Sequence, residues 1–391
     1  MKSLNLFQLL PSVAFLSALL TTSLHRSLSI RSVKVTSFFA GAGGLDRGFE
    51  DAGFDVCWAN EYDRSIWSTY RLNFPETKLD TRSIVDVKPE EIPDCDGMIG
   101  GPPCQSWSEA GELRGLDDKR GQLFFEYIRI LRAKRPLFFL AENVSGIVFS
   151  RHSKAFGKIL NNFAEIGYNV SYFLLNANDY GVPQDRERVI IVGYLAQYGK
   201  HFSPPPVVES KPTLKNAIWD LRTSAVPALE KNRANPKVRR PNHEYFVGGF
   251  SSIYMSRNRV RPWNRPSFTI QAGGRHAPIH PQAPEMVVVG KDARAFVEGH
   301  QYRRLSVREC ARIQTFPDDH LFVYDYVADG YKMIGNAVPV KFAAELAKQI
   351  SIDIASFSKR KRKQVVRGTV ISGRTSSTSQ TVPQGSKKIA S

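Results

Sequence analysis

The sequence predicts an α/β protein built on a doubly wound, mostly parallel sheet, with a second, smaller domain. Two observations in the first part of the chain indicate this fold. An apolar, β-rich run at 33–40 meets a glycine-rich turn at 41–44, and a helical pattern follows. A second strand, expected at 56–59, leads into an acidic residue, Glu61. A strand, a glycine turn and a helix form the opening unit of nucleotide-binding sheets.

The glycine turn and Glu61 together predict a cofactor site. Glycine has no Cβ, so the turn 41–44 lets the backbone approach a ligand closely. An acid just past the second strand is placed to bind ribose hydroxyls. Asp46 stands where the dinucleotide fingerprint has its third glycine. The pattern therefore argues against NAD, and an NAD-dependent oxidoreductase is a weaker alternative.

Two later strands end on reactive side chains. A buried strand is expected at 97–100, with Pro102-Pro103-Cys104-Gln105 at its carboxyl end. Another is expected at 137–141, and Glu142-Asn143-Val144 forms its end. Prolines stiffen the loop that holds the thiol, and a loop of this composition is a poor core site for a cysteine. Because α/β enzymes place ligands at the carboxyl ends of parallel strands, the sequence predicts a thiol and a carboxylate at one edge.

A basic segment precedes a further strand. It carries Gln184, Arg186 and Arg188, and the two arginines share a face if the segment is extended. The thiolate is the reactive form of cysteine, and an unperturbed thiol has a pKa of about 8.5. Arg186 is a candidate for the cation that favours the thiolate and stabilises developing charge.

Seven motifs in order closely resemble those of the cytosine-5 DNA methyltransferases. The resemblance covers about residues 33–350. The motifs are FAGAGGLDRGF (39–49), NEYD (60–63), GGPPCQSWS (100–108), AENV (141–144), QDRERV (184–189), RRLSVRECARIQTFP (303–317) and YKMIGNAVPV (331–340).

The resemblance implies a Rossmann-like fold that binds S-adenosylmethionine, and methyl transfer to carbon 5 of cytosine in double-stranded DNA. Cys104 would attack carbon 6, which makes carbon 5 nucleophilic. Glu142 would hydrogen-bond ring N3 and the exocyclic amine. Carbon 6 cannot be reached inside a duplex, so the base must be flipped out, at a cost of a few kcal/mol. The catalytic residues implied are Cys104, Glu142, Arg186 and Arg188, and the reaction needs no metal.

The resemblance also assigns binding residues. Those expected to bind the cofactor are Phe39, Ala40, Gly41, Gly43, Gly44, Leu45, Glu61, Tyr62, Ser83, Ile84, Pro102, Asn336, Ala337 and Val338. Those expected to bind DNA are Gln105, Ser106, Ser108, Arg257, Arg259, Arg261 and Arg275. One position departs from the family: Ser83 stands where an aspartate usually binds the adenine amino group. Cofactor affinity is expected to suffer unless Asp86 compensates.

The segments at 241–246, 255–264 and 265–284 are similar to those of bacterial modification methyltransferases that recognise GGCC. The polar loop 106–118 resembles the mobile loop that closes on DNA in this family. Arg308 is expected to support the recognition domain rather than the chemistry.

Four parts of the chain are expected to differ in role. Residues 33–204 and 325–355 would form the catalytic domain, and 205–324 would form the target-recognition domain. Residues 1–32 read as a targeting peptide or an unstructured extension, and 356–391 read as a basic disordered tail.

The net charge of +17 is concentrated in the two tails. Residues 1–34 hold four basic residues and no acid, and 356–391 hold nine and no acid, which leaves +4 for the middle. Charge alone is thus weak support for a nucleic-acid partner. We expect a monomer without stable membrane insertion. The tails favour a nucleus or a DNA-containing organelle in a eukaryote, and the cytoplasm in a bacterium.

Two alternatives remain open. A tRNA cytosine-5 methyltransferase shares the chemistry, but that branch has little recognition domain, whereas this chain has about a hundred residues of one. A catalytically silent DNA-binding relic would not need Cys104, Glu142 and Arg186 intact. The biological role, whether restriction partner, orphan or acquired enzyme, does not follow from the sequence.

Overall fold

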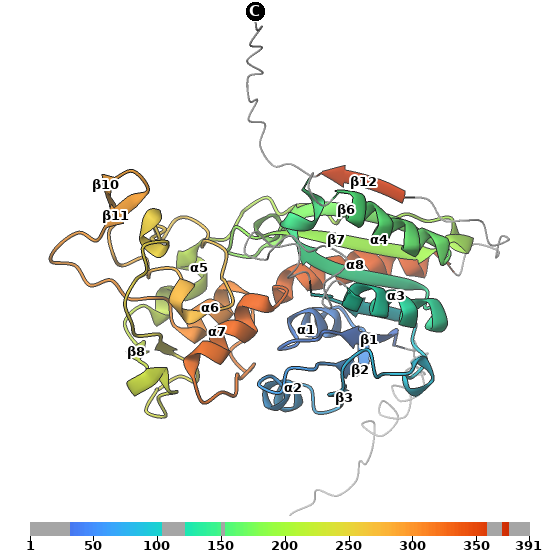
Figure 1. The fold of residues 1–391 in the computed structure, drawn as a ribbon, viewed down its shortest axis with the longest axis horizontal. Helices are drawn as coiled ribbons and strands as arrows, with labels where there is room; N and C mark the ends of the chain where they lie inside the picture. The colour runs from blue at the N-terminus through green and yellow to red at the C-terminus, as the bar shows by residue number, and fades with distance from the viewer. Residues whose placement is uncertain (1–31, 104–121, 150–152, 358–369, 375–391) are drawn as a thin grey trace, which may run out of the picture. The chain divides into compact units, whose positions relative to one another are not determined.

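The fold is described from a computed structural model, which describes residues 32–103, 122–149, 153–357 and 370–374. Eight strands form one sheet in the order β12-β6-β7-β5-β4-β1-β2-β3 (Figure 1). Their bounds are β1 Lys34–Phe38, β2 Asp55–Asn60, β3 Lys78–Asp80, β4 Gly97–Gly100, β5 Phe138–Val144, β6 Tyr168–Asn176, β7 Glu187–Leu195 and β12 Val370–Arg374.

The sheet is parallel except at one strand. β7 pairs antiparallel with both β5 and β6, and every other neighbouring pair is parallel. The predicted doubly wound, mostly parallel sheet is therefore confirmed. The reversed strand carries the basic segment back to the carboxyl end of β5, where Val144 pairs with Arg188.

Helices cover both faces of the sheet. They are α1 Gly44–Asp51, α2 Trp67–Asn73, α3 Gln122–Lys134, α4 Ser153–Glu165 and α8 Val340–Ala355. Neighbouring strand residues point to opposite faces, so Met98 packs in the cluster with α3 and α4, whereas Ile99 packs in the cluster with α1 and α8. Such burial on both sides explains the continuous apolar runs of these strands.

The strand order creates a crevice beside β1. The chain runs from β1 outward to β2 and β3, and then returns to β4 on the other side of β1. In doubly wound sheets, ligands bind at the carboxyl ends of the strands where the order reverses in this way. The topology thus places the ligand site between β1 and β4.

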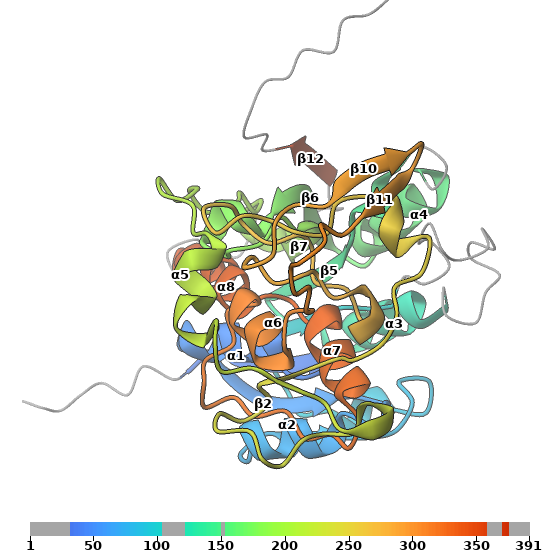
Figure 2. The same cartoon turned by 90° about the vertical axis from the view of Figure 1, so that its left-hand side faces the viewer.

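The residues between β7 and α8 have little regular structure. Three helices lie here, α5 Leu214–Ile218, α6 Val307–Ile313 and α7 Val327–Asn336, and they share a buried apolar cluster. Two short ribbons accompany them, one made of β8 Val226–Pro227 and β9 Glu244–Tyr245, the other of β10 Val287–Gly290 and β11 Ala293–Ala295. Figure 2 shows α6 and α7 side by side, facing the viewer.

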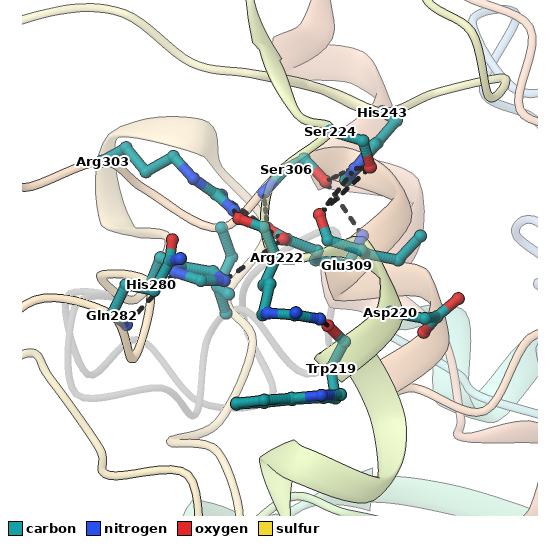
Figure 3. A network of polar contacts seen from close by, with 12 residues as sticks. Trp219, Asp220, Arg222, Ser224, His243, His280, Gln282, Arg303, Ser306 and Glu309 are labelled. Atoms are coloured by element: carbon teal, nitrogen blue, oxygen red, sulfur yellow. Dashed lines mark hydrogen bonds and ion pairs between the residues drawn. The ribbon is translucent and has the colours of Figure 1, made fainter.

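A buried ion pair organises this part of the chain (Figure 3). Glu309 of α6 is fully buried, and its carboxylate accepts hydrogen bonds from Arg303 at 2.7 and 2.8 Å. The backbone N–H of Ser306 donates to the same carboxylate at 2.8 Å. Burial lowers the pKa of His280 to about 4, so this neighbour is neutral near pH 7. Arg303 is therefore the cation that neutralises Glu309.

A second buried carboxylate lies in α1. Asp46 is fully buried and accepts hydrogen bonds from the hydroxyls of Ser37 and Tyr70, both at 2.6 Å. Burial raises the pKa of Asp46 to about 6, and its hydrogen bonds only partly offset this effect.

Two further findings bear on the expectations for membranes and tails. Among the described residues, no helix is both long and apolar enough to cross a membrane. β12 lies inside the segment expected to be a disordered tail, and it pairs parallel with β6 from Val370 to Arg374. That expectation is wrong for these five residues, because they extend the main sheet. The proposed domain boundaries stay predictions.

Asp46 predicts a pH dependence. Between about pH 4 and pH 6 the folded chain keeps a proton that the unfolded chain has released, so the free energy of unfolding falls as the pH rises through this window. Asp46→Asn removes this contribution. From pH 4 to pH 7, urea denaturation should show the wild type losing up to about 3 kcal/mol relative to the variant. The matched control is Asp51→Asn on the same helix, and parallel curves for wild type and Asp46→Asn would contradict the prediction.

Glu309→Gln should destabilise the fold, because the substitution leaves the Arg303 charge buried without its counter-charge. The expected loss in the free energy of unfolding is about 3 kcal/mol, measured by urea denaturation at pH 7. Glu345→Gln breaks an exposed ion pair with Lys348 and should cost under about 1 kcal/mol. Equal losses in the two variants would show that the buried pair is not the organising contact.

Candidate active site

A cavity of about 690 Å³ opens at the carboxyl ends of β1, β2, β4 and β5. It lies at the crevice that the strand order predicts. Its wall combines residues from the start of the sheet with the segment after α7. The predicted cofactor residues that line it are Phe39, Ala40, Gly41, Leu45, Glu61, Tyr62, Ser83, Ile84, Pro102, Asn336, Ala337 and Val338.

The glycine turn contributes in two ways. Gly41 lines the cavity, whereas Gly43 and Gly44 are absent from its wall. Gly43 has φ +81°, a conformation that favours glycine,. A Cβ on Gly44 would come within 2.3 Å of the Val338 carbonyl oxygen. Gly43 and Gly44 therefore shape the turn and its packing, and their assignment to cofactor binding stays a prediction.

Glu61 is fixed against the glycine turn. One carboxylate oxygen accepts from the backbone N–H of Gly41 at 2.8 Å, and the other accepts from the N–H of Asp63 at 2.7 Å. Burial raises the pKa of Glu61, against the opposing effect of these hydrogen bonds. Both oxygens keep acceptor capacity toward the cavity, as ribose hydroxyls require.

The cavity wall also contains the position where this chain departs from the family. Ser83 and Ile84 line the cavity. The Asn60 side chain supports this segment by donating to the carbonyls of Asp80 at 3.2 Å and Arg82 at 2.8 Å. Asp86 is exposed and does not line the cavity, so the suggested compensation by Asp86 has no support in this structure.

The loop that leads to the thiol begins in the cavity wall. Gly101, Pro102 and Pro103 line the cavity, and the Asn143 side chain donates to the Pro102 carbonyl at 3.0 Å. This hydrogen bond ties the loop to the end of β5. Cys104, Gln105, Ser106 and Ser108, and the loop 106–118, lie outside the described residues.

Glu142 faces the same cavity and is paired. Its carboxylate forms an ion pair with the Arg188 Nε at 2.9 Å, and both side chains are nearly buried. Burial lowers the pKa of Arg188, and Glu142 partly offsets this effect. The antiparallel register between β5 and β7 creates the contact, because it brings the basic segment alongside the end of β5.

Arg186 has different partners. It is fully buried, and its guanidinium donates to the carbonyls of Ile270 at 3.0 Å, Gly335 at 2.8 Å and Ala337 at 3.0 Å. Arg186 does not line the cavity. Burial lowers its pKa, to which Arg188 also contributes. Its expected role beside the thiol stays a prediction, and Arg188 is the arginine that contacts the predicted catalytic carboxylate.

The predicted DNA-binding arginines divide into two pairs. Arg257 and Arg275 are exposed, and neither guanidinium has a hydrogen-bond or ion-pair partner within the described segments. Arg259 donates to the carbonyls of Tyr254 and Ile253 at 2.7 and 3.0 Å. Arg261 pairs with Asp185 at 3.1 Å. The first pair is therefore free to bind a ligand, and the second is already used within the fold.

Arg308, expected to have a supporting role, is fully buried. It donates to the carbonyls of Pro241, Pro317 and His320 and to the Asn242 side chain, at 3.1 to 3.3 Å. These contacts fit support of the surrounding backbone.

Sequence reasoning missed several residues of the wall. Asn60, Asp63, Leu123 and Asn143 also line the cavity. Asp63 and Asn143 lie within quoted motifs, but their side-chain partners, Lys332 and the Pro102 carbonyl, are distant in sequence. Within the described part of the chain, no cluster of three or more potential metal ligands exists.

The geometry agrees with comparisons to known proteins. Residues 33–352 match the family of C-5 cytosine-specific DNA methylases. The Type II methyltransferase M.MthTI of Methanothermobacter thermautotrophicus is 56% identical over 326 residues, covering 83% of this chain and 98% of that protein. M.FnuDI of Fusobacterium nucleatum is 52% identical over 336 residues, covering 84% and 97%.

A solved structure supports the fold independently. The Entamoeba histolytica methyltransferase EhMeth superposes with a TM-score of 0.61 at 17% identity, covering 83% of this chain and 99% of that one. At this identity the likeness concerns the fold alone. The family match and the two relatives cover nearly all of the sheet and its helices. The chain therefore belongs to the C-5 cytosine-specific DNA methylase family.

Proposed function

We propose that this protein transfers a methyl group from S-adenosylmethionine to carbon 5 of a flipped-out cytosine in duplex DNA, within the sequence GGCC. One observation carries the assignment of the site. The loop that leads to Cys104 is tied by Asn143 to the end of β5, where Glu142 and Arg188 form their ion pair. Residues 101–103, which precede Cys104, adjoin the same cavity as the Glu142 carboxylate, and both come from neighbouring strand ends.

In this proposal Cys104 attacks carbon 6 as a thiolate, and Glu142 binds ring N3 and the exocyclic amine. Arg188 holds the Glu142 carboxylate in place and presents positive charge to the base. Carbon 5 becomes nucleophilic only while the bond between sulfur and carbon 6 exists. Loss of the carbon 5 proton and of Cys104 then releases the product and the free enzyme.

The cavity suits the proposed cofactor. S-adenosylmethionine supplies the methyl group when it is bound. Glu61 offers two oriented carboxylate oxygens to ribose hydroxyls, and Phe39, Ile84 and Val338 provide an apolar wall for a purine and the methylene groups of the methionine chain. Tyr62 is 72% exposed at this wall, which leaves an aromatic face free to cover a ligand,. Ser83 offers a hydroxyl where the family usually has a carboxylate.

The DNA target is proposed from the segment between β7 and α8. Arg257 and Arg275 are the two predicted DNA-binding arginines whose guanidiniums have no hydrogen-bond or ion-pair partner among the described residues, and arginine is the side chain best suited to read guanine in the major groove. A target containing two guanines in a row fits such a pair. The likeness of 241–246, 255–264 and 265–284 to GGCC-recognising enzymes supports the same target.

The runner-up substrate is tRNA, because the chemistry at the base would be identical. The long segment that contains α5, α6 and α7 favours duplex DNA. It has its own buried apolar cluster, and the tRNA-modifying branch has little recognition domain. Duplex DNA and tRNA substrates that carry 5-fluorocytosine separate the two, because fluorine cannot leave carbon 5 as a proton does and the adduct remains trapped.

We predict that the protein forms a covalent adduct with a GGCC duplex carrying 5-fluorocytosine, in the presence of S-adenosylmethionine. A denaturing gel should show the shifted species for the wild type and none for Cys104→Ser. The matched control Cys57→Ser, which alters a half-buried thiol of β2, should form the adduct normally. An adduct that persists in Cys104→Ser would exclude this nucleophile.

The target sequence needs a separate readout. Bisulfite sequencing of DNA from a bacterial host that expresses the chain should show methylated cytosine at GGCC and not at GCGC. Methylation at a different sequence would overturn the GGCC assignment and leave the chemistry intact. Methylation of tRNA alone would favour the runner-up.

Substitutions of Arg188 and Arg186 should have different effects, on catalysis and on stability respectively. Arg188→Lys keeps a charge near Glu142 but loses the Nε contact, so we expect kcat to fall about 100-fold, with a smaller loss in the free energy of unfolding than Arg186→Lys shows. Arg186→Lys leaves buried carbonyls without donors, so the free energy of unfolding should fall by about 3 kcal/mol. Methylation kinetics and urea denaturation measure the two effects. A reversed pattern would assign the catalytic contact to Arg186.

A further inference from the structure

The carboxylate of Asp63 lies beside Glu61 and takes no part in the chemistry described above. The Asp63 backbone N–H donates to Glu61 at 2.7 Å, and its carboxylate accepts from the N–H and hydroxyl of Ser65 at 3.1 and 2.7 Å. Asp63 lines the cofactor cavity. Its remaining carboxylate oxygen pairs with the Lys332 ammonium group, which comes from α7. The pair joins positions 63 and 332, which are far apart in the chain.

Lys332 supplies the positive charge beside the two carboxylates Glu61 and Asp63. Glu61 and Asp63 are two carboxylates within one short loop, and the charge of Asp63 acts to raise the pKa of Glu61. Lys332 is the only ion-pair partner of Asp63 among the described residues. Burial acts to raise the pKa of Asp63, but the hydrogen bonds from Lys332 and Ser65 outweigh it and hold the pKa below its ordinary value.

Helix α7 is a firm support for this ammonium group. The Tyr331 hydroxyl donates to the Leu305 carbonyl at 2.6 Å and accepts from the Phe246 N–H at 3.2 Å. Lys332 and Asn336 lie one helical turn apart and share a face, and Asn336 lines the cavity. The helix therefore presents Lys332 and Asn336 to the same region.

We infer that Lys332 is a positioning residue for the cofactor, which acts through Asp63 to hold the Glu61–Tyr62 loop in its binding geometry. This inference rests on the proposed function of the cavity. It assigns to Lys332 an effect on cofactor affinity, and none on the attack by Cys104. The pair is partly exposed, with side chains 40% and 33% accessible for Lys332 and Asp63, so its contribution to folding is small.

The test measures binding of S-adenosylhomocysteine to the full chain by calorimetry, without DNA. Lys332→Met should raise Kd about fivefold, as expected for loss of a partly exposed ion pair, and Lys332→Arg should restore most of the affinity. The matched control Lys348→Met breaks another exposed lysine ion pair, on α8, and should leave Kd unchanged. In methylation assays, the KM for S-adenosylmethionine should rise in Lys332→Met, with kcat and the KM for DNA unchanged.

A double-mutant cycle tests whether Lys332 acts through Asp63. Asp63→Asn should weaken binding by a similar factor, and the double variant should bind no more weakly than either single variant. Added salt should reduce the affinity of the wild type more than that of Lys332→Met, because an ion pair is screened. Additive effects in the cycle, or unchanged binding by Lys332→Met, would overturn the inference.

The outcomes are distinguishable from failure of the proposed function. If the wild type does not bind S-adenosylhomocysteine at all, the cofactor assignment of the cavity fails. If the wild type binds and Lys332→Met binds equally well, only the role of Lys332 fails. If Lys332→Met alters kcat at saturating cofactor, the residue contributes to more than positioning and the inference is wrong as stated.

Discussion

A fully buried guanidinium, that of Arg186, holds three distant parts of the chain together. It joins the start of β7 to the carbonyl of Ile270 in the predicted recognition segment and to those of Gly335 and Ala337 at the end of α7. Burying a charge without partners is costly, and the two terminal nitrogens of the Arg186 guanidinium both donate to these backbone carbonyls. The cavity depends on this contact, because Ala337 belongs to its wall.

The same contact explains how one cavity is made from both ends of the sequence. The sheet supplies the glycine turn and Glu61, and the chain then passes through the predicted recognition segment before the end of α7 completes the wall. Gly44 permits the return, since any Cβ there would strike the Val338 carbonyl. The predicted recognition segment thus lies, in sequence, between the two parts of the chain that form the wall of this cavity.

Much of the fold could be predicted from local pattern. Apolar runs with glycine or acidic residues at their ends identified β1, β2, β4 and β5, because a strand buried on both faces leaves a continuous apolar signal. The reversal of β7 could not be predicted, since strand direction depends on pairing between residues distant in sequence. The different contacts of Arg186 and Arg188 were hidden for the same reason. These two arginines are two positions apart, yet the folded chain brings backbone carbonyls to one and the Glu142 carboxylate to the other.

The added strand β12 has a practical meaning for handling this protein. The family match ends at residue 352, whereas β12 lies at 370–374 and covers the outer side of β6. Without β12, β6 would be an edge strand with a row of unpaired main-chain donors and acceptors, which can pair with another molecule. A recombinant protein that ends at residue 352 would leave the edge of β6 unpaired and would be more prone to aggregate. A recombinant protein that includes residues 370–374 keeps this edge paired.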